Sequence, residues 1–119
     1  TISYDISFRV KVEGVNKYVP VGQCDANITW NIRDMITNST GLEWKNEENN
    51  GLCSEVIPHI QQGFNELCNN EDKYEKYEAT NGWGTTKGCK KFFANILQSW
   101  QDLNLEDPVL AEVTTFWIT

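Results

Sequence analysis

Residues 2–12 read Ile-Ser-Tyr-Asp-Ile-Ser-Phe-Arg-Val-Lys-Val, in which apolar and polar residues alternate without a break. Successive side chains of a β-strand point to opposite faces, so this period of two predicts a strand with one buried and one solvated face. Glu13-Gly14-Val15-Asn16 supplies a turn, and residues 17–21 predict a short return strand. Pro20 lacks an N–H, which confines that strand to a sheet edge or a strand end. The chain therefore opens with a β-hairpin.

Three later stretches have the apolar spacing of amphipathic helices. The first is expected to begin at Asn31 as its N-cap and to end at Gly41, a residue suited to the left-handed position after a helix. A short charged segment follows the second helix, and the third begins at Thr85 or Thr86. The expected helical ranges are 31–40, 53–69 and 85–103, with the short segment at 70–77.

The remaining segments complete the predicted fold. Residues 24–30 are expected to link the hairpin to the first helix, and the polar residues 42–51 to form a loop. Residues 109–118 are rich in β-formers and apolar on both faces, which predicts a central strand that pairs with the first strand. Alternating β-α units are absent. We therefore expect one α+β domain over residues 1–119, with a three-stranded antiparallel sheet packed on one face by three or four helices.

The composition is that of an acidic globular protein. The chain has 119 residues, 10 Lys and Arg against 17 Asp and Glu, and a formal net charge of −7. Aromatic residues make up 12%, which argues against disorder. A duplex-DNA binder is disfavoured, because binding phosphates requires clustered Lys and Arg. The apolar runs are too short to span a membrane, and no signal peptide is visible, so we expect a cytoplasmic protein that does not contact membranes.

The four cysteines, Cys24, Cys53, Cys68 and Cys89, include no close pair of the kind that structural zinc sites use. We therefore expect no metal. Cys68 and Cys89 lie at same-face helical offsets from aromatic and aliphatic residues, which predicts buried thiols. A disulfide framework is the alternative, and four cysteines allow three pairings.

No residue pattern for catalysis or for a cofactor stands out. His59 is the single histidine, and neither a nucleophile elbow nor a phosphate-binding glycine loop accompanies it. We therefore expect no cofactor and lean toward a protein that is not an enzyme. A small nucleotide-processing enzyme that uses carboxylates such as Asp25 or Asp34 remains a rival, as does an oligomeric structural subunit.

Two short segments carry chemistry suited to a flat polar ligand. Asn27, Thr29, Trp30 and Asn31 place amides, a hydroxyl and an indole within one turn, next to a helix N-terminus that favours anions. Asn81 and Trp83 lie in the sequence Asn-Gly-Trp-Gly at the start of the third helix, close to its free amides. The alternatives are structural: an N-cap with a core tryptophan, and a tight turn whose tryptophan packs on the following helix.

The acidic middle of the chain is the candidate surface for a partner. Residues 41–80 carry nine acidic and three basic side chains. A contiguous acidic face imitates a phosphate backbone and docks on a basic nucleic-acid channel of another protein. The alternative is a face that only keeps the protein soluble. The candidate residues for this surface are Glu43, Glu47, Glu48, Glu71 and Asp72.

The order of these motifs resembles small proteins encoded by bacteriophages and prophages. The shared pattern is a β-hairpin, the segment Asn27-Ile28-Thr29-Trp30-Asn31, a Lys-Tyr segment and Asn81-Gly82-Trp83-Gly84 before a helix rich in aromatic and leucine residues. The loop at 42–51 is longer and more polar than the loop that this pattern leads us to expect at that place. The resemblance covers most of the chain and implies a setting, the phage-infected bacterial cell, rather than an activity.

By analogy with other small acidic phage proteins, we expect a non-enzymatic accessory protein that inhibits a host defence system, for example as an anti-CRISPR protein. Two mechanisms compete. The protein either sequesters a signalling nucleotide at the two polar segments, or docks its acidic face on a nucleic-acid-binding effector as a DNA mimic. A small nucleotide-like ligand and a host defence protein are therefore the expected partners, and self-association is the further possibility.

Overall fold

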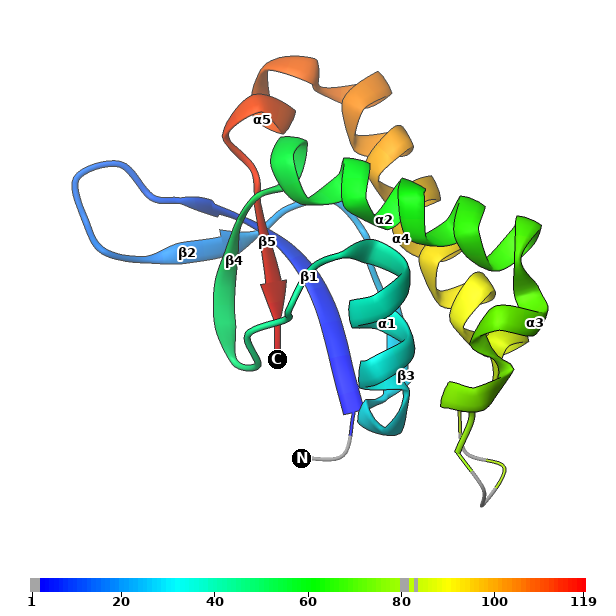
Figure 1. Cartoon of the computed structure of the whole chain (residues 1–119). Helices are drawn as coiled ribbons and strands as arrows, with labels where there is room; N and C mark the ends of the chain where they lie inside the picture. The colour runs from blue at the N-terminus through cyan, green and yellow to red at the C-terminus, as the bar shows by residue number, and fades with distance from the viewer. Residues whose placement is uncertain (1–2, 80–81, 83) are drawn as a thin grey trace.

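Strand β1 (Ser3–Lys11) lies at the centre of the computed structural model, which describes residues 3–79, 82 and 84–119. One end of β1 pairs with β2 (Tyr18–Pro20) and the other with β3 (Asn27–Thr29). The middle of β1 pairs with β5 (Thr115–Ile118), and β4 (Glu48–Leu52) pairs with β5 on its far side. All pairings are antiparallel, so the sheet has five strands in an α+β fold (Figure 1).

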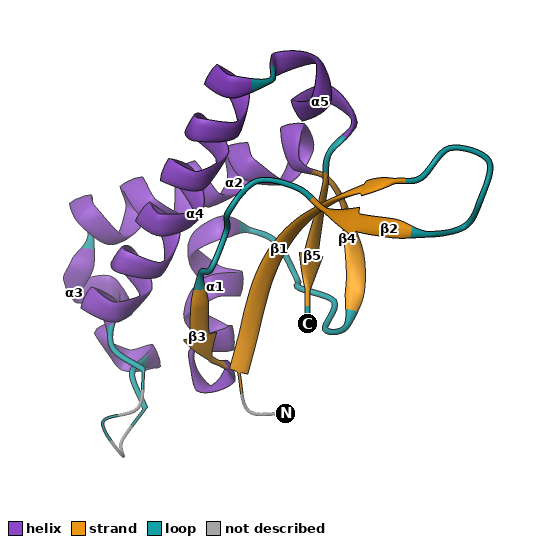
Figure 2. Ribbon diagram, turned by 180° about the vertical axis from the view of Figure 1, so that it is seen from behind, coloured by secondary structure: helices purple, strands orange, loops and turns teal. Residues whose placement is uncertain are grey.

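The sheet has one buried face and one open face. On β1 the even-numbered Tyr4, Ile6 and Phe8 are buried, whereas Asp5 is exposed and Ser7 is half-buried. Phe116 and Ile118 of β5 are buried on the same side. Both ribbon views show the helices gathered to one side of the sheet, with the loop between β1 and β2 projecting away from them (Figures 1 and 2).

Helices α1, α2 and α4 supply the other half of the core. The apolar stripe of α4 packs against α2, which in turn packs against α1. The contact is tight at Gly63 of α2, where a Cβ atom would lie 2.6 Å from Cγ2 of Thr40 and 3.0 Å from Cε2 of Phe93. The helical elements are η1 (Trp30–Ile32), α1 (Arg33–Thr40), α2 (Cys53–Asn69), α3 (Glu71–Tyr74), η2 (Glu75–Tyr77), α4 (Thr86–Glu106) and α5 (Pro108–Val113).

The helix ends follow local chemistry. Thr85 caps α4 by accepting the Gly88 N–H, and Gly41 ends α1 in the left-handed conformation with φ 76°. Asp107 accepts the Leu110 N–H, and Pro108 follows it at the first position of α5. The prediction that Asn31 is the N-cap of the first helix is wrong. Thr29 precedes η1 and its hydroxyl accepts the Asn31 N–H, so α1 starts two residues later.

Three expected segments differ in the structure. Residues 27–29 and 48–52 form strands rather than a link and a loop, so the sheet has five strands instead of three. These strands are only three and five residues long and owe their conformation to pairing with β1 and β5, which local propensity does not reveal. Residues 108–113 form α5 rather than the start of the last strand, although the expected pairing of the last strand with β1 is confirmed.

The chain leaves the sheet between β2 and β3. Val21 N–H still donates to the Phe8 carbonyl, and Ala26 accepts the Ile6 N–H, but the residues between them leave the ladder. Pro20 ends β2, and Gly22 adopts φ 68°, a conformation that glycine reaches without strain. This excursion brings residues 21–23 beside α4.

All four cysteines are free thiols. Cys53 and Cys89 are buried and Cys24 is half-buried, and burial raises the pKa of each, that of Cys89 to about 12. The expected burial is confirmed for Cys89 and wrong for Cys68, which is exposed near the end of α2 while its neighbour Leu67 is buried. None of the helices in the described part of the chain is long and apolar enough to cross a bilayer.

Candidate functional site

The first predicted ligand segment lies along β3 and η1, at the start of β1. The amide of Asn27 donates to the Asp5 carboxylate, and the hydroxyl of Thr29 accepts the Asn31 N–H at 3.5 Å. Both side chains therefore have partners within the protein. Trp30 is 49% exposed, so it is not the core tryptophan of the structural alternative.

The second predicted ligand segment meets the first at Gly84. A Cβ atom on Gly84 would lie 3.3 Å from Cγ2 of Thr29 and 3.4 Å from Cδ1 of Ile32. Two segments far apart in the sequence are thus neighbours in the fold. Asn81 and Trp83 lie outside the residues that the structure describes.

Two of the amides at the start of α4 already donate hydrogen bonds within the protein. The Thr86 N–H donates to Oε1 of Glu78 at 2.7 Å, and the Gly88 N–H donates to Oγ1 of Thr85 at 3.0 Å. A phosphate at this position would have to displace the Glu78 carboxylate, and would meet a like charge beside it. The helix start therefore favours an anionic ligand less than the sequence suggests.

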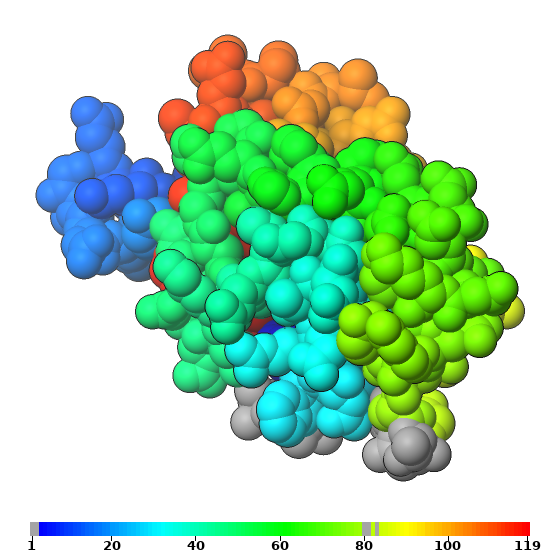
Figure 3. All heavy atoms as spheres, in the orientation of Figure 1, coloured from blue at the N-terminus to red at the C-terminus, as the bar shows by residue number. Residues whose placement is uncertain are grey.

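The predicted partner-binding acidic residues form two groups. Glu43, Glu47 and Glu48 lie in and before β4, whereas Glu71 and Asp72 lie on α3, and α1 lies between the two elements (Figure 3). Arg33 pairs with Glu43 at 3.3 Å and Lys90 pairs with Glu71 at 3.5 Å. Two of the five carboxylates are thus partly neutralised by the chain's own cations.

Another acidic surface lies at the end of α4 and on α5. Residues 92–119 contain no Lys, Arg or His. We call residues 99–113 the C-terminal corner. It lies at the top of Figure 3, in orange to red. None of the ion pairs found among the described residues involves it. Its four carboxylates are Asp102, Glu106, Asp107 and Glu112.

The corner also exposes aliphatic side chains. Leu105, in the last turn of α4, is 76% exposed, and Val109 and Val113 of α5 are 74% and 59% exposed. Val109 and Val113 are four residues apart and therefore share one face of α5. We call these three residues the aliphatic group. A contiguous apolar patch rimmed by polar residues is typical of protein–protein contact sites, whereas single exposed aliphatic residues are common on any surface.

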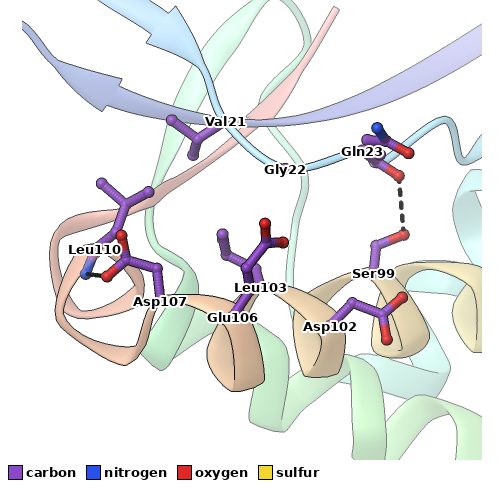
Figure 4. A pocket seen from close by; sticks show the side chains of 9 residues that line it. All are labelled: Val21, Gly22, Gln23, Ser99, Asp102, Leu103, Glu106, Asp107 and Leu110. Atoms are coloured by element: carbon purple, nitrogen blue, oxygen red, sulfur yellow. Dashed lines mark hydrogen bonds between the residues drawn. The ribbon is translucent and has the colours of Figure 1, made fainter.

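A cavity of about 750 Å³ opens beside the corner, where residues 21–23 face α4 and α5 (Figure 4). Val21, Leu103 and Leu110 supply its aliphatic lining. Ser99 and Asp102 lie at one end, and Asp107 at the other.

The carboxylates of the cavity differ in their internal partners. Oδ1 of Asp107 accepts the Leu110 N–H at 3.0 Å, and Oδ1 of Asp102 accepts a hydrogen bond from Gln98 at 3.0 Å. Glu106 makes no side-chain hydrogen bond or ion pair with any other described residue, and its carboxylate stands between α4 and the segment 21–23 (Figure 4). The cavity lining contains no basic residue.

The open face of the sheet carries a second concentration of polar and aromatic groups, which we call the sheet-face cluster. The Arg9 guanidinium lies 4.7 Å from the ring centroid of Trp117, and Nε of Arg9 donates to Ser7 at 3.0 Å. Nε1 of Trp117 donates to Thr115 at 2.9 Å, and the Tyr18 ring lies 5.0 Å from the Trp117 ring. These groups are bound to one another rather than left open.

A third polar group lies at the junction of α2 and α3. The Glu66 carboxylate accepts hydrogen bonds from Tyr74 at 2.8 Å, Asn70 at 3.2 Å and Lys73 at 3.4 Å. The Tyr74 hydrogen bond is the main cause of a lowered pKa at Glu66. Burial, with the Glu66 charge beside it, raises the pKa of Tyr74 to about 12.

Comparison with protein-family models, with curated proteins and with solved structures found no significant match for this chain. Among the described residues, no three His, Cys, Asp or Glu side chains are grouped so that they would hold a metal ion. The sequence interpretation missed the C-terminal corner. Its one visible signal was the absence of basic residues after Lys91, and the apolar side chains of residues 109–113 were assigned to a buried strand.

Proposed function

We propose that this chain is a non-enzymatic binding protein whose C-terminal corner docks on a basic surface of a protein partner. The resemblance described above suggests the setting, a phage accessory protein that inhibits a nucleic-acid-binding effector of a bacterial defence system. One observation carries the proposal: the corner combines exposed aliphatic side chains with four carboxylates and contains no cation.

The charge of the corner favours a basic protein over a nucleotide. Carboxylates repel phosphates and attract the Lys and Arg side chains that line nucleic-acid channels, and this attraction also accelerates encounter. The predicted acidic residues on either side of α1 support docking less strongly, because Arg33 and Lys90 already pair with two of them.

The aliphatic group would supply affinity that charge alone does not. Burying a Leu or Val side chain in an interface contributes about 1.5–3 kcal/mol at most, whereas an exposed ion pair contributes about 0–1 kcal/mol. A partner that covers Leu105, Val109 and Val113 would therefore bind more tightly than a DNA mimic that uses charge only. The expected partner surface is basic at its rim and aliphatic at its centre.

A binding experiment with a defined probe tests the proposal. An immobilised amphipathic helical peptide, with arginines on one face and leucines on the other, is exposed to the protein in biolayer interferometry. The aliphatic variant carries Leu105→Ser, Val109→Ser and Val113→Ser, and the charge variant carries Asp102→Asn, Glu106→Gln and Glu112→Gln. The matched control carries Glu43→Gln, Glu47→Gln and Glu48→Gln, which removes three charges elsewhere.

We expect the aliphatic and charge variants each to bind about tenfold more weakly, which corresponds to a loss of about 1.4 kcal/mol in binding free energy. The control should change affinity less than about twofold. An equal loss in the control and the charge variant would show that net charge alone drives binding, and would contradict docking at the corner. Circular dichroism of each variant establishes that it is folded.

The biological setting has its own test. Phages that carry the wild-type, charge-variant or control sequence are plated on hosts with and without nucleic-acid-targeting defence systems. We expect the wild type and the control to protect the phage on one defended host, and the charge variant to fail there. If Trp30→Ala abolishes protection while the charge variant retains it, the half-exposed indole is the functional group and nucleotide sequestration is favoured instead.

A further inference from the structure

The cavity beside the C-terminal corner has two chemically distinct parts. Its aliphatic part consists of Val21, Leu103 and Leu110, from the segment after β2, from α4 and from α5. Its polar part is lined by Asp102 and Glu106, about one turn apart on α4, and the Glu106 carboxylate points toward the segment 21–23 whereas Asp102 lies at the Ser99 end (Figure 4). A ligand that fills this cavity must therefore have an apolar stem and a polar end.

The charges that line the cavity determine which charge the polar end of the ligand must carry. Asp102, Glu106 and Asp107 line the cavity without a basic residue. The last carbonyl groups of α4 add partial negative charge, because a helix C-terminus carries the negative end of the helix dipole. Phosphate and carboxylate ligands are repelled, whereas a cation at Glu106 would meet a carboxylate that has no other partner among the described residues.

We infer that this cavity receives an arginine side chain of the docked partner. The methylene stem of arginine packs on Leu103 and Leu110, and its guanidinium lies between Asp102 and Glu106. A planar guanidinium has five N–H donors and is more weakly hydrated than an ammonium, so it bridges two carboxylates better than lysine does. This inference rests on the proposed function, since the arginine belongs to the partner.

Small-molecule probes test the inference without the partner. The ¹⁵N-labelled full chain is titrated with L-arginine amide, with L-lysine amide and with L-citrulline amide. The citrulline probe has the same α-ammonium group as the arginine probe and a side chain of nearly the same shape, but that side chain is uncharged. We expect L-arginine amide to shift the backbone amide signals of Gly22, Gln23 and Ser99. L-Citrulline amide should leave them unchanged, and L-lysine amide should require a higher concentration.

Variants locate the site. Removing the Glu106 charge by Glu106→Gln should raise the dissociation constant of L-arginine amide about two- to fivefold, the range of one exposed ion pair. The double variant Asp102→Asn with Glu106→Gln should bind more weakly still. Glu48→Gln, on β4 and outside the cavity lining, is the matched control and should bind as the wild type does.

Three results would overturn the inference: no shift at Gly22, Gln23 and Ser99, equal binding of the citrulline and arginine probes, or lysine binding as tight as arginine. The two proposals fail separately. If the arginine probe leaves the cavity unaffected while the aliphatic variant still loses peptide binding, the cavity assignment is wrong and the docking surface stands. If the probe binds in the cavity but no variant affects the peptide, docking at the corner is wrong.

Discussion

The sheet-face cluster and the C-terminal corner both place charged and apolar groups near the surface, yet they differ in how those groups are partnered. On the sheet, Arg9 lies over Trp117 and donates to Ser7, and the Trp117 indole donates to Thr115. At the corner, Glu106 has no such described partner and the aliphatic group is exposed. Side chains bound to one another stabilise the fold, whereas side chains without partners remain available to bind another molecule.

The largest effect should come from Trp117→Ala in the sheet-face cluster. This change removes the contacts of Arg9 and Tyr18 and leaves Thr115 without the indole donor. We expect a loss of about 2–3 kcal/mol in unfolding free energy, below the range for fully buried tryptophans because Trp117 is only half-buried. Urea unfolding followed by circular dichroism measures it.

The aliphatic variant of the corner is the contrast to Trp117→Ala. Its three serines replace exposed side chains, so each should change the unfolding free energy by about 0.5 kcal/mol or less. Similar losses in the two regions would show that the aliphatic group is part of the core and would contradict its role as a free binding surface.

An effect of intermediate size should distinguish two carboxylates of the corner, Asp107 and Asp102, by the unfolding free energy that each substitution costs. Asp107 caps α5 by accepting the Leu110 N–H, so Asp107→Ala should cost about 1 kcal/mol of unfolding free energy. Asp102→Asn keeps an acceptor for Gln98 and should cost about 0.5 kcal/mol or less. Thermal unfolding of the two variants side by side measures the difference. A costly Asp102→Asn would mean that Asp102 also has a structural role.

The smallest effect should appear in the pH dependence of the Glu66–Tyr74 hydrogen bond. The pKa of Glu66 is lowered in the folded state, so its stabilisation is present above the ordinary glutamate pKa and is lost as the pH falls through the folded value. The pKa of Tyr74 is raised to about 12, so its stabilisation is lost as the pH rises from about 10 to 12. Melting temperatures of the wild type and Tyr74→Phe should therefore converge at both extremes. A constant difference between them from pH 3 to 11 would show that this bond does not couple to protonation.

The long elements could be predicted from sequence because each carries its own periodic pattern. The strict alternation of residues 2–12 marks β1, and the apolar stripe with Pro58 in the first turns marks α2. β3 and β4 could not be predicted because segments of only three to five residues become strands when a partner strand is present, and β4 is rich in Asn, which disfavours strands. α5 was missed because its valines favour strands, although Asp107-Pro108 is a good helix start.

The candidate site depends on contacts that no local pattern contains. The cavity forms where residues 21–23 leave the sheet and meet α4, and only the packing of the whole domain brings these segments together. The same holds for Gly84, whose approach to Thr29 joins two segments that the sequence interpretation had singled out separately. Pattern reasoning identified residue types suited to binding but not which of them already have partners.

The four free thiols differ in burial, so the rates at which a reagent modifies them report how often the native structure opens. Cys68 is exposed, whereas burial protects Cys24, Cys53 and Cys89 and raises their pKa values, which depletes the reactive thiolate. A thiol reagent should therefore modify Cys68 at once, the half-buried Cys24 more slowly, and Cys53 and Cys89 only as fast as the molecule opens. The delay between modification of Cys68 and modification of the buried thiols reports how often the core of the native structure opens.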